Sequence, residues 1–222
     1  MGKLSLKKPV LQVALDLLTI DETINIAKRA IDGGVDWIEA GTPLIKYEGV
    51  KAVKKLREVF PEAFIVADMK TMDTGSLECK IALENGANIM TVLGVAPNET
   101  IEAAVDMARE LRGYVMVDLI NVQNVFNRAK EAESLGADII CLHLGIDQQK
   151  KHKIDFETVH KLFEMVSIPI AVAGGINKDT APLAIKSGAK IIIVGSAITK
   201  SKDPKASALE IKRAMESVYE IP

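Results

Sequence analysis

Short apolar runs recur along the chain about every 25 residues, and a stretch with the period of an amphipathic helix follows each run. The runs consist mainly of Ile, Val and Leu with little polar alternation, which is typical of strands covered on both faces. Their spacing matches the shortest strand–loop–helix–loop unit of a parallel sheet. Eight such units fill the sequence and predict strands at residues 11–17, 37–41, 64–69, 89–94, 114–120, 139–144, 168–173 and 191–194.

A glycine that can end a helix in a left-handed cap precedes four of these strands, at Gly34, Gly86, Gly136 and Gly188. This recurring glycine pattern indicates an internal repeat of one structural unit along the chain. We therefore predict an α/β fold, a (β/α)8 TIM barrel. No linker, low-complexity tract or charge block divides the chain, so residues 1–222 are expected to form a single domain. The alternative, a doubly wound open sheet, would rarely use eight near-equal units.

The segments between the strands carry helix signals. Residues 50–56 place an apolar stripe against a basic face, which predicts an amphipathic helix. Short polar side chains predict N-caps at Thr19 or Asp21 for the first helix, at Asn98 after the fourth strand and at Asn177 after the seventh.

Composition limits the partners and the compartment. The chain is 48% hydrophobic and 26% charged with a net charge of −2, which suits a soluble globular enzyme and gives no reason to expect nucleic acid or an anionic membrane as partner. No apolar run approaches the roughly 20 residues of a membrane helix, and residues 1–9 lack an apolar signal region. Cys79 and Cys141 lack metal-type spacing, so we expect small buried residues in a reducing cytoplasm.

The third predicted strand ends in an unusual group of charges. Asp68 and Lys70 lie two residues apart and should share one face of the strand, and Asp73 follows at the start of a helical pattern. Removing any one of these charges from water alone costs several kcal/mol, so they must pair, bind an ion or face water in a cleft. Asp73 has a second interpretation, as a cap of the helix that follows.

Other strands also end in polar residues. Asp16, Glu39, Asp118 and His143 follow the first, second, fifth and sixth strands, and the carboxyl ends of barrel strands form the working face of this fold. A purely structural interpretation is also open: the acids at the strand ends could do no more than cap the helices that follow, and His143 could be a hydrogen-bonded core histidine. A lysine gathered with several acids at one rim is instead typical of an active site.

Glycine-bearing turns follow the last two strands. Gly174 with Gly175, and Gly195 with Ser196, come where barrels often hold a phosphate on bare backbone N–H groups. Glu39 and Asp68 come from adjacent strands and could share a Mg²⁺, which takes one or two carboxylates together with waters and substrate oxygens.

The motif Asp68-x-Lys70-x-x-Asp73 resembles that of the orotidine-monophosphate-decarboxylase superfamily of barrels. Within this superfamily the chain is similar to the 3-hexulose-6-phosphate synthases over its whole length. The matches are residues 11–18, 39–45, 67–73, 117–120, 172–175 and His143-x-Gly145-x-Asp147, of which 41–45 and 67–73 are specific.

The resemblance implies a lyase reaction, the reversible and Mg²⁺-dependent condensation of ribulose 5-phosphate with formaldehyde to a 3-hexulose 6-phosphate. A base removes the C1 proton beside the ketone, and Lys70 and the metal hold the enediolate that then attacks formaldehyde. By likeness, His143 carries the proton, and Glu39 and Asp68 bind the metal.

The resemblance also implies roles for other residues. Asp16 and Asp118 would bind sugar hydroxyls and orient the lysine. In the superfamily the site lies at a dimer interface, and the residue that matches Asp73 reaches across from the partner chain. A homodimer is therefore expected.

Two departures bear on the choice within the superfamily. The relatives that decarboxylate orotidine or keto-gulonate phosphates carry an arginine near the eighth-strand phosphate loop, where this chain has Gly195, Ser196 and Ala197. The keto-gulonate enzymes also have an arginine three residues after the histidine, where this chain has Ile146. Both absences favour the aldolase. The alternatives are a 3-keto-L-gulonate-6-phosphate decarboxylase and, in another class, a non-catalytic sugar-phosphate-binding barrel.

Overall fold

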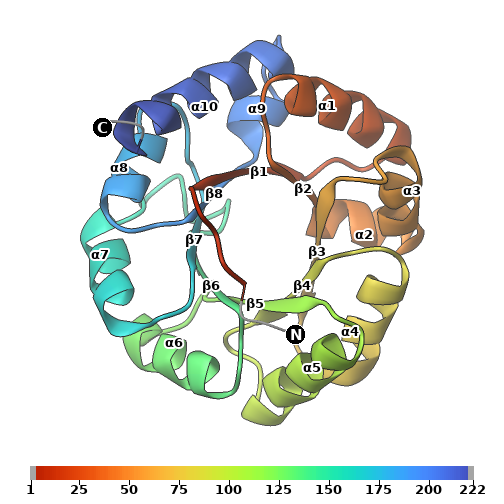
Figure 1. The fold of residues 1–222 in the computed structure, drawn as a ribbon, viewed down its shortest axis with the longest axis vertical. Coiled ribbons are helices and arrows are strands. Elements are labelled where there is room, and N and C mark those ends of the chain that lie inside the picture. The colour runs from red at the N-terminus through yellow and green to blue at the C-terminus, as the bar shows by residue number, and fades with distance from the viewer. Residues whose placement is uncertain (1–3, 220–222) are drawn as a thin grey trace.

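Eight parallel strands close into a barrel in the computed structural model, which describes residues 4–219 (Figure 1). Each strand pairs with its neighbours in sequence, and the first pairs with the last. Every predicted strand overlaps an observed one, so the prediction of a (β/α)8 barrel is confirmed. The strands are β1 Val10–Leu15, β2 Trp37–Ala40, β3 Phe64–Thr71, β4 Ile89–Leu93, β5 Tyr114–Asp118, β6 Ile139–His143, β7 Ile170–Ala173 and β8 Ile191–Val194.

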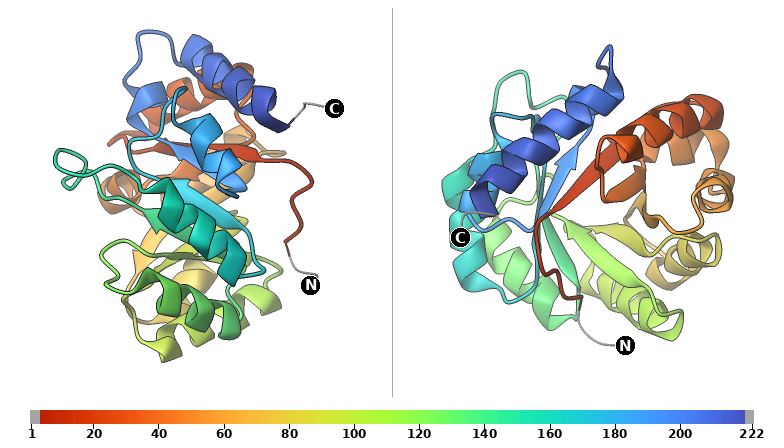
Figure 2. Two further views of the ribbon diagram at one scale, coloured as in Figure 1. Left: turned by 90° about the vertical axis from the view of Figure 1, so that its left-hand side faces the viewer. Right: turned by 45° about the horizontal axis from the view of Figure 1, so that its top comes forward.

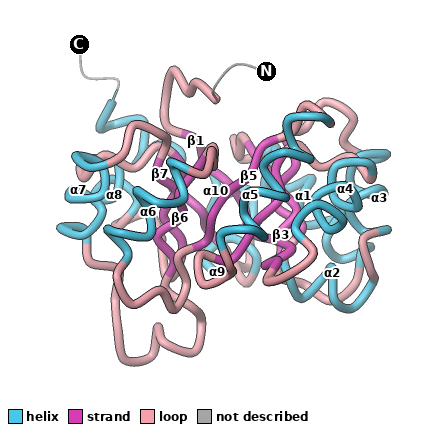
Figure 3. Tube along the Cα trace, turned by 90° about the horizontal axis from the view of Figure 1, so that it is seen from below, coloured by secondary structure: helices cyan, strands magenta, loops and turns pink. Residues whose placement is uncertain are grey.

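Helices surround the barrel on its outer side (Figures 1 and 2). They are α1 Ile20–Asp32, α2 Thr42–Glu48, α3 Lys51–Val59, α4 Gly75–Glu84, α5 Asn98–Glu110, α6 Val125–Ser134, α7 Phe156–Met165, α8 Ala181–Lys186, α9 Ser196–Thr199 and α10 Pro204–Tyr219. The short helices α2 and α9 directly follow β2 and β8 at the carboxyl rim. Figure 3 shows both of them on the side of the barrel opposite to the two chain ends. None of the helices within residues 4–219 is long and apolar enough to cross a membrane.

Two apolar layers place the polar side chains at one rim. The larger layer fills the space between the strands and the helices, and the smaller one lies inside the barrel with its aromatic side chains at the amino-terminal end. In this smaller layer Trp37 stacks on Phe64 with ring centroids 4.3 Å apart, and Phe64 lies 6.4 Å from Tyr114. Because large apolar side chains occupy that end of the interior, the charged side chains that point inward gather at the carboxyl end.

The helix-end predictions were partly right. The four glycines before strands have the expected positive φ, between 93° and 102°. Thr19 occupies the backbone N-cap position of α1 but makes no side-chain cap bond. Asn98 was wrong as a cap, because it is the first residue of α5 and its side chain bonds Glu131. The prediction that residues 1–9 lack an apolar signal region falls partly outside the structure, because residues 1–3 are not among the described residues.

Candidate active site

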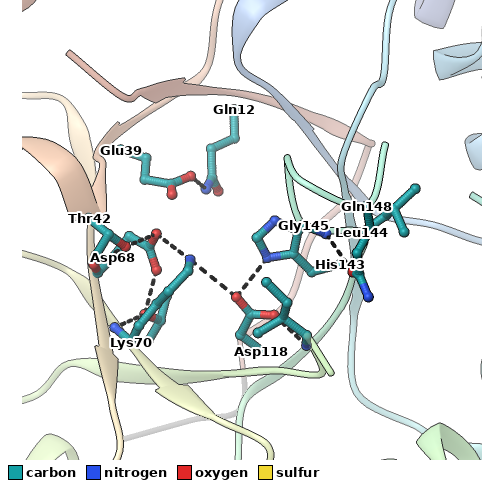
Figure 4. Close-up of polar contacts among 12 residues, drawn as sticks. Gln12, Glu39, Thr42, Asp68, Lys70, Asp118, His143, Leu144, Gly145 and Gln148 are labelled. Carbon is teal, nitrogen blue, oxygen red and sulfur yellow. Dashed lines mark hydrogen bonds and ion pairs between the residues drawn. The ribbon is translucent and has the colours of Figure 1, made fainter. Parts of the chain in front are cut away.

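Lys70 lies between two carboxylates at the carboxyl rim of the barrel (Figure 4). Its Nζ is 2.6 Å from Oδ2 of Asp68 and 3.4 Å from Oδ2 of Asp118. Burial alone lowers the pKa of Lys70, but the charges of Asp68 and Asp118 outweigh burial and hold the pKa above its ordinary value. The amine is therefore a cation at neutral pH, and the predicted grouping of Lys70 with acids is observed.

An irregularity in β3 presents this lysine. Ala67 pairs with Met90 and Thr71 with Val92, so β3 advances four residues while β4 advances two. Such bulges re-aim side chains and are common next to active sites. Lys70 lies in the bulge with φ +47°, a left-handed conformation that non-glycine residues seldom adopt. The strand thus carries backbone strain at the position of its central charged residue.

Asp118 joins Lys70 to His143. Its Oδ2 is 2.8 Å from Nδ1 of His143, and its Oδ1 accepts the backbone N–H of Ile120 at 2.9 Å. Burial alone raises the pKa of Asp118, but the hydrogen bond from His143, the charge that the His143 ring carries when protonated, and the charge of Lys70 outweigh it, so the pKa lies below its usual value. An ionised Asp118 accepts a hydrogen bond from the Nδ1–H group of His143, which leaves Nε2 as the nitrogen available to a substrate.

A second group of acids lies on β2 and β3 and directly after β1. Burial raises the pKa of Glu39 well above its usual value, and the neighbouring charges of Asp68 and Asp16 add to the effect. Burial and then Asp68 also raise the pKa of Asp16. Gln12 donates from Nε2 to Oε2 of Glu39 at 2.5 Å. Asp16, Glu39 and Asp68 thus lie close together, and the positive charge beside them does not fully offset their mutual repulsion.

A cavity of about 570 Å³ opens over these groups, and both glycine-bearing turns form part of its wall. Gly174 has φ +110°, and a Cβ there would overlap the carbonyl oxygen of Leu144. A glycine is therefore required for the turn to pack against the end of β6. Every predicted site residue except Asp73 lines the cavity, namely Asp16, Glu39, Asp68, Lys70, Asp118, His143, Gly174, Gly175, Gly195 and Ser196.

Asp73 lies apart from the cavity lining formed by residues 4–219. Its side chain is exposed, and its Oδ1 accepts the backbone N–H of Thr74 at 2.7 Å. The first residue of α4 is Gly75, with Thr74 at the N-cap position, so Asp73 does not cap that helix in the usual way. One chain alone does not bring Asp73 to Lys70.

The cavity lining also includes polar residues that were not predicted. Gln12, Thr42, Thr91 and Lys200 line the cavity, and the first three bond the predicted acids. Gln12 and Thr91 lie inside the apolar runs rather than at the strand ends, where site residues were sought. Thr42 lies in the first turn of α2. A polar residue at an inward strand position was the available signal for Gln12 and Thr91.

The acid group fits a hard divalent cation. Within residues 4–219 no three His, Cys, Asp or Glu side chains are grouped to hold a metal, so the protein offers fewer ligands than a closed site needs. Glu39 and Asp68 supply carboxylate oxygens of the kind that Mg²⁺ uses with waters and substrate oxygens. In the described residues Oε1 of Gln12 is buried without a hydrogen-bond partner beside Glu39. A cation here would offset the burial and the repulsion by Asp68 and Asp16 that raise the pKa of Glu39.

The fold and site define a TIM-barrel enzyme with a cationic lysine held among acids at the carboxyl rim. A model of the Orotidine 5'-phosphate decarboxylase / HUMPS family matches residues 9–211, and the chain belongs to this family. A 3-hexulose-6-phosphate synthase from Bacillus subtilis (strain 168) is 41% identical, with 91% of this chain and 97% of that protein aligned. The predicted resemblance to these synthases and the expectation of a lyase are confirmed.

Solved structures agree with this assignment. A crystal structure of 3-hexulose-6-phosphate synthase has a TM-score of 0.88 at 40% identity, covering 92% of this chain and 99% of the other. The 3-keto-L-gulonate-6-phosphate decarboxylase of Vibrio cholerae O1 biovar El Tor str. N16961 has a TM-score of 0.86 at 28% identity, covering 96% and 100%.

Proposed function

We propose that this chain catalyses the reversible, Mg²⁺-dependent aldol condensation of ribulose 5-phosphate with formaldehyde to 3-hexulose 6-phosphate. The observation that carries the proposal is the linked arrangement of Lys70, Asp118 and His143 in one cavity. It supplies a proton acceptor and a fixed cation side by side, which an enediolate intermediate requires.

His143 takes the proton in this mechanism. With Nδ1 bonded to Asp118, the neutral ring has its lone pair on Nε2, which removes a proton from C1 of ribulose 5-phosphate. The C–H electron pair becomes the C1–C2 double bond, and the C2 carbonyl oxygen becomes an oxyanion. C1 then attacks formaldehyde, and the new alkoxide takes up a proton to give the hexulose.

Lys70 stabilises the charge that develops on the sugar oxygens. Its ammonium is already held by Asp68 and Asp118, so little reorganisation is needed as the oxyanion forms. Asp16 lies on the acid side of the cavity, where its carboxylate can accept hydrogen bonds from sugar hydroxyls. Asp118 serves the same purpose while it orients Lys70 and His143.

The phosphate is proposed to bind at the turns after β7 and β8. Gly174, Gly175, Gly195 and Ser196 line the cavity there, and glycines let the backbone come close to an anion. Lys200 lines the same part of the cavity and adds a positive charge. The sugar then extends from these turns toward Lys70.

Glu39 and Asp68 are the residues that would hold Mg²⁺. The bound cation supplies Lewis-acid stabilisation of negative charge on the sugar oxygens. Within the protein, Gln12 keeps the Glu39 carboxylate in place, and Thr42 donates to Oδ2 of Asp68 at 2.6 Å.

A homodimer would complete the site. Asp73 is exposed, and Met72 and Leu77 beside it are 49% and 58% exposed. Exposed apolar side chains close to an unused acid support a subunit contact in which Asp73 enters the cavity of the partner.

The two cysteines, Cys79 and Cys141, are free and buried, which supports a reducing cytoplasm.

The decarboxylase alternative has less support. The side chain of Ile146 lines the mouth of the cavity and is 65% exposed, at the position where the keto-gulonate enzymes are expected to carry an arginine. An apolar side chain there cannot pair with a charged group of the substrate.

An activity assay separates the two reactions. Incubation with ribulose 5-phosphate, formaldehyde and Mg²⁺ should consume formaldehyde and form the hexulose phosphate, and the reverse reaction should release formaldehyde. Release of carbon dioxide from 3-keto-L-gulonate 6-phosphate, without formaldehyde turnover, would support the decarboxylase. The Lys70→Ala variant tests the non-catalytic alternative, because a mere binder would show no turnover before or after the change.

A further inference from the structure

A threonine on β4 makes two hydrogen bonds to the bulged part of β3. Thr91 is 4% exposed and lines the cavity. Its Oγ1 lies 3.0 Å from the backbone nitrogen of Lys70 and 2.7 Å from Oδ1 of Asp68. One hydroxyl therefore contacts both charged residues whose ion pair forms the centre of the proposed site.

The direction of each bond is fixed by the groups involved. The backbone N–H of Lys70 can only donate, so Oγ1 of Thr91 accepts it. The hydroxyl has one proton, and it goes to the carboxylate of Asp68, which accepts. The hydroxyl thus fixes the Asp68 carboxylate relative to the Lys70 backbone. A methyl group in its place could make neither bond.

The bulge explains why this hydroxyl is needed. Between the pairs Ala67–Met90 and Thr71–Val92, Thr91 is the single β4 residue opposite the extra β3 residues. Regular ladder bonding is interrupted there, and the Lys70 N–H is paired with a side chain instead. Lys70 also holds its φ of +47°, which persists only when the surroundings determine it.

We infer that Thr91 is a positioning residue for the active site, which holds the strained backbone of Lys70 and aligns Asp68 through one hydroxyl group. The expected effect on turnover rests on the proposed function, whereas the expected effect on the Lys70 backbone does not. Asp68 has a second threonine partner, Thr42, on its other oxygen, but Thr42 does not bond the Lys70 backbone. Among residues 4–219, Thr91 is the one whose side chain bonds both the Lys70 backbone and the Asp68 carboxylate.

The test compares Thr91→Val, which keeps the shape and removes the hydroxyl, with Thr91→Ser, which keeps the hydroxyl. The matched control is Thr100→Val, a change at a buried threonine of α5 that lies outside the cavity lining. Partners that orient the groups of a site are typically worth about 10–100-fold. We expect Thr91→Val to lower kcat by about 10–100-fold with KM for ribulose 5-phosphate changed little, Thr91→Ser to remain near wild type, and Thr100→Val to leave kcat unchanged.

A second readout does not depend on activity. Amide hydrogen exchange at Lys70 should be faster in Thr91→Val than in the wild type and in Thr91→Ser, because the N–H loses its acceptor. If Thr91→Val does not fold, Thr91→Ala takes its place in the same comparison. Equal exchange rates and equal kcat in all variants would overturn the inference, and so would an equal loss in Thr91→Val and Thr91→Ser. Faster exchange in Thr91→Val without any formaldehyde turnover by the wild type would contradict the proposed function alone.

Discussion

Asp118 accepts a hydrogen bond from Nδ1 of His143 through the same oxygen that lies 3.4 Å from the Lys70 ammonium. A single carboxylate oxygen therefore sets the tautomer of the proposed base and balances the charge of the cation beside it. This relationship connects the proton-transfer and charge-stabilising halves of the mechanism.

Replacing Asp118 should test that connection. In Asp118→Asn, the amide can donate to Nδ1 of His143, which moves the ring proton to Nε2 and removes the proposed base. General acid–base catalysis contributes about 10²–10⁴-fold, so kcat should fall by that order. Asp106→Asn, at an exposed acid of α5 paired with Arg109, is the control and should retain full activity. Wild-type kcat in Asp118→Asn would exclude this role.

Formaldehyde reacts with uncharged amines, and Lys70 should resist it. The two carboxylates raise the pKa of Lys70, although burial opposes them, so the amine has almost no free lone pair at neutral pH. With formaldehyde and cyanoborohydride, exposed lysines such as Lys80 should be methylated much faster than Lys70, as measured by peptide mass spectrometry. Asp118→Asn should speed methylation of Lys70 about tenfold for each unit by which its pKa falls. Methylation of Lys70 in the wild type at the rate of Lys80 would contradict this explanation.

Glu39 should make the metal-free protein sensitive to pH. Burial and two neighbouring acids raise its pKa, so the folded state binds this proton more tightly than the unfolded chain does. The free energy of unfolding therefore falls as pH rises above about 4.3, the unfolded value, by about 1.4 kcal/mol for each unit until the folded pKa is passed.

The Glu39→Gln variant keeps an acceptor for Gln12 and removes the charge. Without metal it should be more stable than wild type at pH 8, and the difference should shrink toward pH 4. Added Mg²⁺ should stabilise the wild type more than the variant. Denaturant unfolding at several pH values measures both effects, and a destabilised Glu39→Gln at pH 8 would show that the carboxylate is not under electrostatic strain.

Asp73 gives a test of the proposed dimer. If each site takes Lys70 from one chain and Asp73 from the other, Lys70→Ala and Asp73→Asn homodimers should both be inactive. A mixed dimer should contain one intact site. Subunit exchange in an equal mixture should then restore about a quarter of wild-type activity, because half of the dimers are mixed and each has one working site. Mixed dimers without activity would place Asp73 and Lys70 of one chain in the same site, and an active Asp73→Asn homodimer would place Asp73 outside the site.

Much of the site could be predicted because parallel strands bring their carboxyl ends together. Knowing that Asp16, Glu39, Asp118 and His143 end their strands was enough to place them on one rim with Lys70, without any knowledge of loop structure. The alternation of side chains along β3 also placed Asp68 and Lys70 on one face. These are consequences of chain periodicity and fold alone.

The unpredicted features depend on contacts between segments far apart in sequence. The β3 bulge is defined by its register against β4, so neither the φ of Lys70 nor the role of Thr91 is visible in the local sequence. Asn98 looked like a helix cap, but its side chain is occupied by Glu131 on α6, which local capping preferences cannot anticipate. The entry of Asp73 into the cavity of a partner chain stays a prediction.

Exchange of the C1 proton of ribulose 5-phosphate with solvent tests the central mechanism most directly. The protein with Mg²⁺ and ribulose 5-phosphate in D₂O, without formaldehyde, should form the enediolate and return it with deuterium at C1, as followed by NMR. His143→Ala and Lys70→Ala should each lose this exchange, because one lacks the base and the other the cation beside the oxyanion. Formaldehyde consumption by a wild-type protein that exchanges no C1 proton, or unchanged exchange in both variants, would contradict the account.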